Sequence, residues 1–226
     1  MSVILSVETS TKICSVALHR EGHLLGCQEL FLEKSHSSQL VVLIQDVLKQ
    51  CDFSLDDMAA FAVSVGPGSY TGLRIGVSTI KGLCYGLDKP VIAVNTLEAM
   101  AYGGGQLNDE NALLCPMIDA RRMEVYCLIM NHQLEVVEKT QAKIIDEHSF
   151  ADYLTDQKIL FFGNGAAKCR EVLGYQQNAL FTGRVSPSAI HMGYVAAQKF
   201  REKAFEDLAY FEPFYLKDFL AGKPKK

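Results

Sequence analysis

The sequence predicts an α/β protein of two lobes, each a mixed β-sheet with flanking helices. Its 226 residues suffice for one large domain or two small ones. Both halves open on three short apolar segments separated by polar turns, and both continue with a strand and a helix. The glycine run at 103–105, followed by polar residues, marks a boundary. We therefore expect lobes at 1–105 and 106–226, with the C-terminal helix packing back on the first lobe.

The first half is expected to form an antiparallel meander followed by alternating helices and strands. Apolar segments with short polar turns between them are typical of such a meander. In chain order, the predicted elements are strands at 3–7, 13–19 and 24–32, a helix at 36–51, a strand at 61–65, a helix at 70–86, a strand at 91–94 and a short helix before the glycine run.

The second half repeats this order less cleanly. Ser186 and Pro187 suit the N-cap and first position of the last helix. The predicted elements are strands at 112–119, 123–130 and 134–140, a helix near 147–155, a strand at 158–162, a helix after the sequence GNGA, and a helix at 188–203.

Composition and charge argue against several classes of protein. The formal net charge is −4, and the basic cluster of the tail, Lys223, Lys225 and Lys226, is best explained as a solvated end. We therefore expect no nucleic-acid binding by this chain alone. No apolar run reaches the length of a bilayer span, and the N-terminus has no signal-peptide pattern, so we expect a cytoplasmic protein. The histidines are dispersed, which predicts no metal site.

The glycine-rich stretch SVGPGSYTGLRIGVST, residues 64–79, does not match a nucleotide-binding loop. A Walker-type loop needs a lysine after its last glycine, and Leu73 follows Gly72 here. GPGS instead predicts a tight turn that leads into the helix. Glycine inside a helix is unfavourable, so Gly76 and Gly82 need a compensating role. Either they pack on the protein's own sheet, or they face a partner; a Gly76→Leu substitution that spared folding and weakened partner binding would support the second.

The helix at 36–51 has more apolar surface than one buried face requires. Leu40, Leu43, Ile44, Val47 and Leu48 form the expected core stripe, and two further valines at 41 and 42 lie beyond it. The helix is therefore either deeply buried in its lobe or in contact with a partner.

Four motifs resemble one family closely. ETST, KSHSSQL, GPGSYTGLRIGVSTIKGL and DARRMEVY are similar to segments of the TsaB family, also called YeaZ, of the actin-like ATPase superfamily with its ribonuclease H-like fold. The resemblance covers nearly the whole chain. It implies an accessory subunit in the synthesis of N6-threonylcarbamoyladenosine (t6A) at position 37 of tRNAs that read ANN codons. It also implies a TsaD-like catalytic partner, a TsaE-like ATPase, a homodimer when the chain is alone, and contact with tRNA only through the complex.

The resemblance assigns residues to two surfaces. The partner or dimer interface is expected at the two first-lobe helices, through His36, Leu40, Val41, Ile44, Leu48, Tyr70, Leu73, Arg74, Gly76, Val77 and Ile80. A vestigial nucleotide site is expected at Glu8, Thr9, Ser10, Thr11, Gly163, Asn164 and Gly165. The alternative for the ETST residues is an ordinary turn, because Ser and Thr are common there.

Catalytic residues are not evident. The superfamily usually has Asp where this chain has Glu8, and the second-lobe turn, normally glycine-rich, reads DARR here. His36 stands alone where catalytic TsaD relatives pair histidines on a helix to hold a metal. We therefore expect a non-catalytic protein that requires no cofactor and binds ATP or ADP weakly at most. The alternative is an active ATP-dependent enzyme of this fold, or a peptidase.

Overall fold

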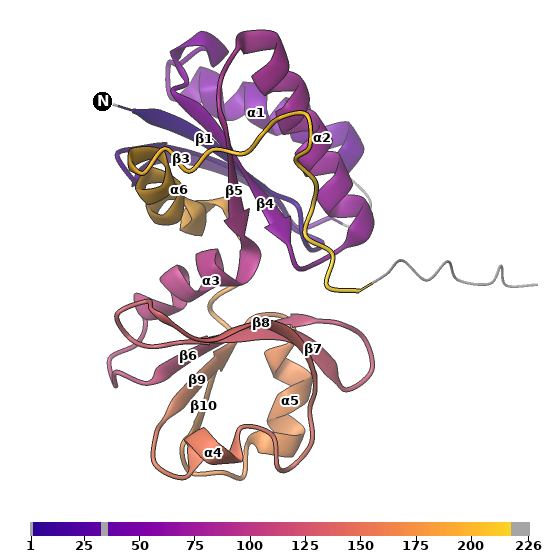
Figure 1. The fold of residues 1–226 in the computed structure, drawn as a ribbon, viewed down its shortest axis with the longest axis vertical. Coiled ribbons are helices and arrows are strands. Elements are labelled where there is room, and N and C mark those ends of the chain that lie inside the picture. The colour runs from indigo at the N-terminus through magenta and orange to yellow at the C-terminus, as the bar shows by residue number, and fades with distance from the viewer. Residues whose placement is uncertain (1, 33–35, 218–226) are drawn as a thin grey trace, which may run out of the picture.

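The computed structural model describes residues 2–32 and 36–217, and the basic tail with Lys223, Lys225 and Lys226 lies outside this part, as does Ser35. Figure 1 shows two lobes, one above the other, each built on a sheet of five strands. The predicted class, a two-lobed α/β protein with mixed sheets, is confirmed. Within the described residues, no helix is both long and apolar enough to cross a bilayer.

The first sheet has the strand order β3-β2-β1-β4-β5. β1 pairs antiparallel with β2 and parallel with β4, so the meander joins the parallel part of the sheet at β1. β1 is buried on both faces, as its continuous apolar sequence indicates. The strands are β1 (Val3–Glu8), β2 (Cys14–Arg20), β3 (His23–Leu30), β4 (Ala60–Gly66) and β5 (Val91–Asn95).

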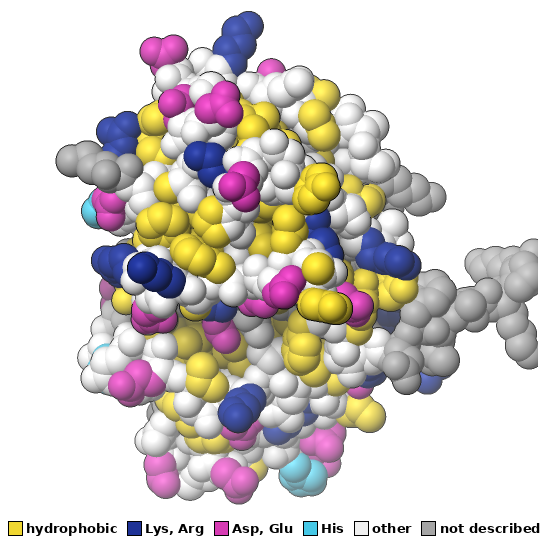
Figure 2. Space-filling view, turned by 45° about the horizontal axis from the view of Figure 1, so that its top comes forward, with side chains coloured by type: hydrophobic (Ala, Val, Ile, Leu, Met, Phe, Trp, Pro, Cys, Tyr) yellow, Lys and Arg dark blue, Asp and Glu magenta, His cyan; other side chains and the backbone are white. Residues whose placement is uncertain are grey.

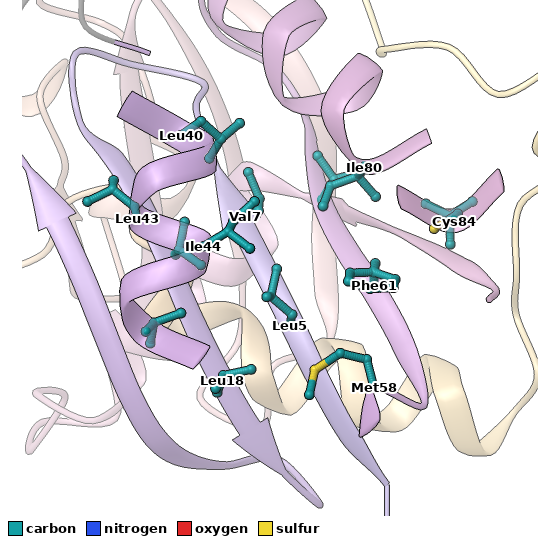
Figure 3. Packing of buried hydrophobic residues seen from close by; sticks show 14 of the residues in the cluster. Leu5, Val7, Leu18, Leu40, Leu43, Ile44, Met58, Phe61, Ile80 and Cys84 are labelled. Atoms are coloured by element: carbon teal, nitrogen blue, oxygen red, sulfur yellow. The ribbon is translucent and has the colours of Figure 1, made fainter. Parts of the chain in front are cut away.

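Helices α1 (His36–Gln50) and α2 (Tyr70–Leu87) cover one face of this sheet. Leu40 and Ile44 of α1 and Ile80 of α2 point into a common core with Leu5 and Phe61 of the sheet (Figure 3). A short 3-10 helix, η1 (Leu55–Asp57), leads into β4.

The opposite face of the first sheet is covered by a segment from the far end of the chain. The 3-10 helix η2 (Ala189–His191) and α6 (Met192–Arg201) follow the second lobe in sequence and pack on the first sheet (Figure 1). Met192 and Ala196 share a core with Ile4, Ala62 and Ile92. The chain therefore crosses between the lobes twice.

The second sheet has the order β10-β9-β6-β7-β8. One face packs on α4 (Ala151–Leu154) and α5 (Ala166–Leu173), and the other on α3 (Thr96–Gly105), which lies between the lobes. The strands are β6 (Leu113–Asp119), β7 (Glu124–Met130), β8 (Val136–Ile144), β9 (Ile159–Phe162) and β10 (Ala179–Thr182).

Several predicted boundaries were wrong for local reasons. The glycine run at 103–105 is the end of α3, where Gly103 lies against the His191 ring and Gly104 against the Phe162 ring, so that a Cβ would not fit at either position. The division into lobes at residue 105 stays a prediction. Ser188, and not Ser186, is the N-cap of the 3-10 helix η2 that leads into α6, and its side chain accepts a hydrogen bond from Ile190 N. Only 151–154 of the predicted 147–155 helix is helical, and the short strand β10 was not predicted.

After α6 the chain forms an extended strap, residues 205–217, along the first lobe (Figure 1). Phe211 is buried in the core under α1 and α2, and Lys81 of α2 donates to the Phe211 carbonyl at 2.9 Å. Phe214 N donates to the Val65 carbonyl at 2.8 Å. The strap ends at Lys217, which pairs with Glu124 of the second lobe.

Candidate functional site

The turn between β1 and β2 is held closed by the start of α2. Ser69 N donates to the Ser10 carbonyl at 2.6 Å, and the Thr9 hydroxyl donates to the Gly72 carbonyl at 2.9 Å. The side chains of Thr9 and Ser10 are both fully buried. The Thr9 hydroxyl is thus engaged by the protein's own backbone, and the Ser10 hydroxyl, which has no partner among the described residues, is buried inside the closed turn.

The Glu8 carboxylate is buried beneath this turn without a counter-ion. Its Oε1 accepts from Ser10 N at 2.6 Å and from the Ser64 hydroxyl at 3.0 Å, while Oε2 has no partner among the described residues. Burial raises the pKa of the Glu8 carboxyl, and the hydrogen bonds from Ser10 and Ser64 oppose that rise. Glu8 thus links β1 to β4 and to the turn from inside the fold.

The glycines of the 64–79 stretch make this closure sterically feasible. A Cβ at Gly68 would overlap the Ser10 carbonyl, one at Gly72 the Thr9 carbonyl, and one at Gly76 the Thr9 hydroxyl. The prediction that Gly76 faces a partner was therefore wrong, and the alternative, packing on the protein's own sheet, is the one that holds. A Gly76→Leu variant would not keep the lobe folded, because the larger side chain has no space there.

The second-lobe residues of the predicted nucleotide site support the end of β6. Asn164 Oδ1 accepts from Asp119 N at 3.1 Å, and Gly165 N donates to the Met117 carbonyl at 3.0 Å. A Cβ at Gly165 would approach the Ile118 carbonyl carbon to 2.9 Å. Gly163 adopts a positive φ of 97°, which suits glycine.

The two groups of predicted nucleotide-site residues each contact their own lobe. Glu8, Thr9 and Ser10 bond to one another and to 64–72, whereas Gly163–Gly165 bond to β6; Thr11 at the mouth of the turn accepts from Ile13 N at 3.4 Å. A cleft of about 430 Å³ opens elsewhere, between the strap and the ends of β4 and β5. It is lined by Val65, Ala93, Glu206, Asp207, Tyr210, Phe211 and Glu212, and by none of the predicted residues.

Most of the predicted interface residues are in the core, so the prediction had the wrong faces of the two helices. They point toward the sheet because the apolar stripe of each helix is the side that the sheet buries (Figure 3). The buried members are His36, Leu40, Ile44, Leu48, Leu73, Gly76, Val77 and Ile80. His36 opens α1 and its Nε2 lies 3.3 Å from the Ile13 carbonyl.

Val41, Tyr70 and Arg74 are the predicted interface residues that reach the surface. Val41 is 51 % exposed, and Arg74 stacks over the Tyr70 ring and hydrogen-bonds to its hydroxyl at 3.0 Å. Whether these three contact a partner stays a prediction.

The outward face of α2 carries residues that the prediction missed. Tyr85 is 84 % exposed, and a Cβ at Gly82 or Gly86 would meet nothing within 4 Å. Ser78, Gly82 and Gly86 are four apart, but Ser78 is only two residues after Gly76, a rotation of about 200° on a helix. This rotation places Gly72 and Gly76 on the inward face of α2, and Ser78, Gly82 and Gly86 on its outward face. Hydrophobic side chains gather over the visible face of the first lobe (Figure 2).

Histidine, cysteine and carboxylate side chains do not cluster as metal ligands anywhere in the part of the chain that the structure describes. His36 Nε2 faces the Ile13 carbonyl, and His36 belongs to no group of metal-ligand side chains among the described residues.

Two mixed sheets with this strand order, joined by helices between the lobes, define a protein of the actin-like ATPase fold. The activator of 2-hydroxyisocaproyl-CoA dehydratase from Clostridium difficile shares it, with a TM-score of 0.51 and 7 % identity over 90 % of this chain and 96 % of that one. The family model described as TsaD, tRNA N6-adenosine threonylcarbamoyltransferase, matches residues 30–224.

Closer relatives give the family. The tRNA threonylcarbamoyladenosine biosynthesis protein TsaB of Escherichia coli is 33 % identical over 226 residues, 97 % of this chain and 96 % of that protein. The TsaB of Bacillus subtilis is 30 % identical over 223 residues, 95 % and 93 % of the two chains. The structure of YeaZ from Pseudomonas aeruginosa superposes with a TM-score of 0.80 at 26 % identity, over 96 % of this chain and all of that one. This chain belongs to the TsaB (YeaZ) family, and the predicted resemblance is confirmed.

Proposed function

We propose that this chain is a non-catalytic subunit of the assembly that makes t6A in tRNA. The names of its relatives state this process. The chain binds a TsaD-like catalytic subunit and thereby activates threonylcarbamoyl transfer to adenosine 37. A TsaE-like ATPase completes the assembly, and the chain pairs with itself when alone. The closed β1–β2 turn carries the proposal, because Thr9 and Ser10 are already bonded to 69–72.

The outward faces of α1 and α2 are the surface we assign to the partner. Val41 and Val42 of α1 are 51 % and 43 % exposed, and Tyr85 is the most exposed apolar side chain of α2. Gly82, one helical turn before Tyr85 on α2, leaves open space. A helix backbone of the partner can approach closely where side chains are absent, and an exposed tyrosine beside such a gap is typical of an interface anchor.

Substitutions on this face test the proposal by size-exclusion chromatography with light scattering. The chain is measured alone and mixed with the TsaD-like protein of the same organism. We expect Gly82→Glu and Tyr85→Ala to weaken the complex at least tenfold while the melting temperature of the chain alone stays unchanged or rises. Gly82→Glu places a charge in the open space, and Tyr85→Ala removes the anchor.

Ile144→Ala is the matched control, since Ile144 is 72 % exposed on β8 of the second lobe. It should bind as the unchanged chain does. If both α2 variants bind the partner as tightly as the unchanged chain does, the assignment of this face is refuted. If the unchanged chain does not bind the TsaD-like protein, the proposed function is refuted.

A further inference from the structure

The turn between β6 and β7 holds two consecutive arginines in an unfavourable backbone conformation. Arg121 and Arg122 have φ of 69° and 48°. Side chains other than Gly, Asn and Asp seldom adopt this left-handed region. The sequence DARR, which departs from the glycine-rich turn expected of an ATPase, therefore places arginines where glycine or asparagine would be more stable. Strained residues in a rigid setting are a sign of function.

The turn is rigid because Lys168 of α5 reaches under it. Lys168 Nζ donates to the carbonyls of Arg122 at 2.7 Å and Glu124 at 2.6 Å, and it pairs with Asp119. Asp119 Oδ1 also accepts from Arg121 N at 2.9 Å. The backbone beneath the two arginines is thus fixed from both sides.

The arginine side chains lie at the surface of the second lobe. Both residues are exposed, and across residues 2–32 and 36–217 neither guanidinium forms an ion pair or a cation–π contact. Asp119 on the turn is paired with Lys168, and Arg121 adds an electrostatic attraction to the same carboxylate. The hydrogen bonds of Lys168 and Asp119 hold the backbone of the turn, whereas the two guanidiniums stay exposed and outside any ion pair among the described residues, so an external anion can bind them.

More cations and an aromatic pair adjoin the turn. Lys217 at the end of the strap pairs with Glu124, so the strap meets the second lobe beside the arginines. Two residues earlier, Tyr215 lies against Tyr70, with ring centroids 4.7 Å apart, and Arg74 lies over Tyr70 at 5.2 Å. Glu212 adds one carboxylate to the same stretch of the strap. Lys and Arg side chains are visible beside the end of the described chain (Figure 2).

We propose that this turn and the end of the strap form an RNA contact, in which Arg121 and Arg122 bind phosphates and Tyr215 offers a face for an unpaired base. Guanidinium groups match phosphate geometry, and bases of any identity stack on tyrosine. An acidic protein surface would use the cations and leave the aromatic pair without a role, so RNA fits better. The inference deepens the proposed function, on which it rests for the identity of the RNA as tRNA.

A double substitution separates this role from a structural one. Arg121→Asn with Arg122→Gly removes both charges and supplies residues that suit the left-handed conformation. We expect the melting temperature of the chain to rise. We also expect the chain assembled with its TsaD-like partner to bind a labelled, unmodified tRNA transcript about tenfold more weakly, measured by fluorescence anisotropy across a range of salt concentrations. The salt dependence of log K should fall by about 1.5, since each lost phosphate contact accounts for roughly 0.7–0.9.

Lys203→Gly is the matched control, because Lys203 is also an exposed cation with a positive φ, 56°, on the first lobe. It should raise the melting temperature and leave RNA binding unchanged. Unchanged tRNA affinity in the double variant would overturn the proposal, and so would an equal loss in the Lys203→Gly control. Weaker assembly with the partner at unchanged tRNA affinity would show that the turn contacts protein instead, and would also overturn it.

Failure of the proposed function would be recognised separately. If the chain and the TsaD-like protein do not assemble, the same transcript is titrated against the chain alone at low salt. Loss of that binding in the double variant supports the RNA contact, and unchanged or undetectable binding of the unsubstituted chain overturns it.

Discussion

Individual residues of the 64–79 stretch show how one residue type serves opposite purposes. Gly72 and Gly76 are buried against Thr9, while Gly82 and Gly86 face solvent in the same helix. The first pair lets α2 lie on the β1–β2 turn. The second pair has no intramolecular role, and it costs helix stability that a partner contact would offset.

Alanine at Gly76 and at Gly82 should therefore change stability in opposite directions. Gly76→Ala places a Cβ onto the Thr9 hydroxyl, so we expect the free energy of unfolding to fall by about 1–3 kcal/mol. Gly82→Ala meets open space, so we expect a rise of up to about 1 kcal/mol. Urea unfolding of both variants measures this, and equal effects would contradict the two environments.

Glu8 should make the stability of the fold depend on pH. Because burial raises its pKa in the folded state, its contribution is fully present below its ordinary pKa of 4.5 and is lost as the pH rises through the folded value. Glu8→Gln keeps an oxygen for Ser10 and Ser64 and cannot ionise. As the pH rises from 4.5 toward neutral, we expect the unchanged chain to lose stability relative to Glu8→Gln, so the difference between their free energies of unfolding should shift in favour of the variant. Parallel pH profiles would show that Glu8 does not titrate in this range.

At the scale of elements, η2 and α6 determine how the chain returns to the first lobe. The start of α6 rests on β2, because Gly193 lies directly against the His19 ring and a Cβ there would overlap it. His19 Nε2 lies 3.1 Å from the Ile190 carbonyl, and the ring is 1 % exposed. Ser188 Oγ donates to Glu29 at 2.5 Å, and Ala189 N donates to the Ser15 hydroxyl at 2.9 Å. These contacts explain why a helix from the end of the sequence belongs to the first sheet.

This docking should weaken in mild acid. The pKa of His19 is lowered from 6.5 to about 4, chiefly by burial and to a smaller extent by nearby His191, while the hydrogen bond to the Ile190 carbonyl opposes the shift. A group whose pKa is depressed by folding favours the unfolded chain once that chain takes up a proton. Stability that is present above pH 6.5 is therefore lost as the pH falls toward 4, by about 3 kcal/mol for a shift of this size. Hydrogen exchange of α6 amides should report it, and the loss should be smaller in His19→Gln.

At the scale of the whole molecule, several contacts among the described residues tie the two lobes together. α3 packs on the second sheet and contacts α6, Asn95 Nδ2 donates to the Thr140 hydroxyl at 2.9 Å, and Lys217 of the strap pairs with Glu124. The turns that could face a nucleotide are each engaged within their own lobe. We therefore expect that nucleotide is not needed for the fold or for partner binding.

Thermal unfolding with and without Mg²⁺-ATP tests this expectation. A ligand that binds the folded state at a hundred times its Kd stabilises it by about 2.7 kcal/mol. We expect no change in melting temperature at millimolar ATP. A clear rise that is lost in Thr9→Ala would contradict the proposal that the β1–β2 turn is closed to phosphate, and would favour the alternative of an active ATP-dependent enzyme.

The sequence by itself determined the two-lobed α/β class, the order of nearly all strands and helices, and the family. Apolar periodicity and turn residues are local signals, and the 64–79 stretch is distinctive enough to recognise. Which face of α1 and α2 is free was decided only by the tertiary structure. A helix with apolar residues around much of its circumference can bury either side, and the sheet takes the side with Leu40, Ile44 and Ile80. The position of α6, the closure of the turn by Gly72 and Gly76, and the meeting of the strap with the Arg121–Arg122 turn join residues far apart in sequence. Such contacts leave no local pattern, because only the folded chain brings their partners together.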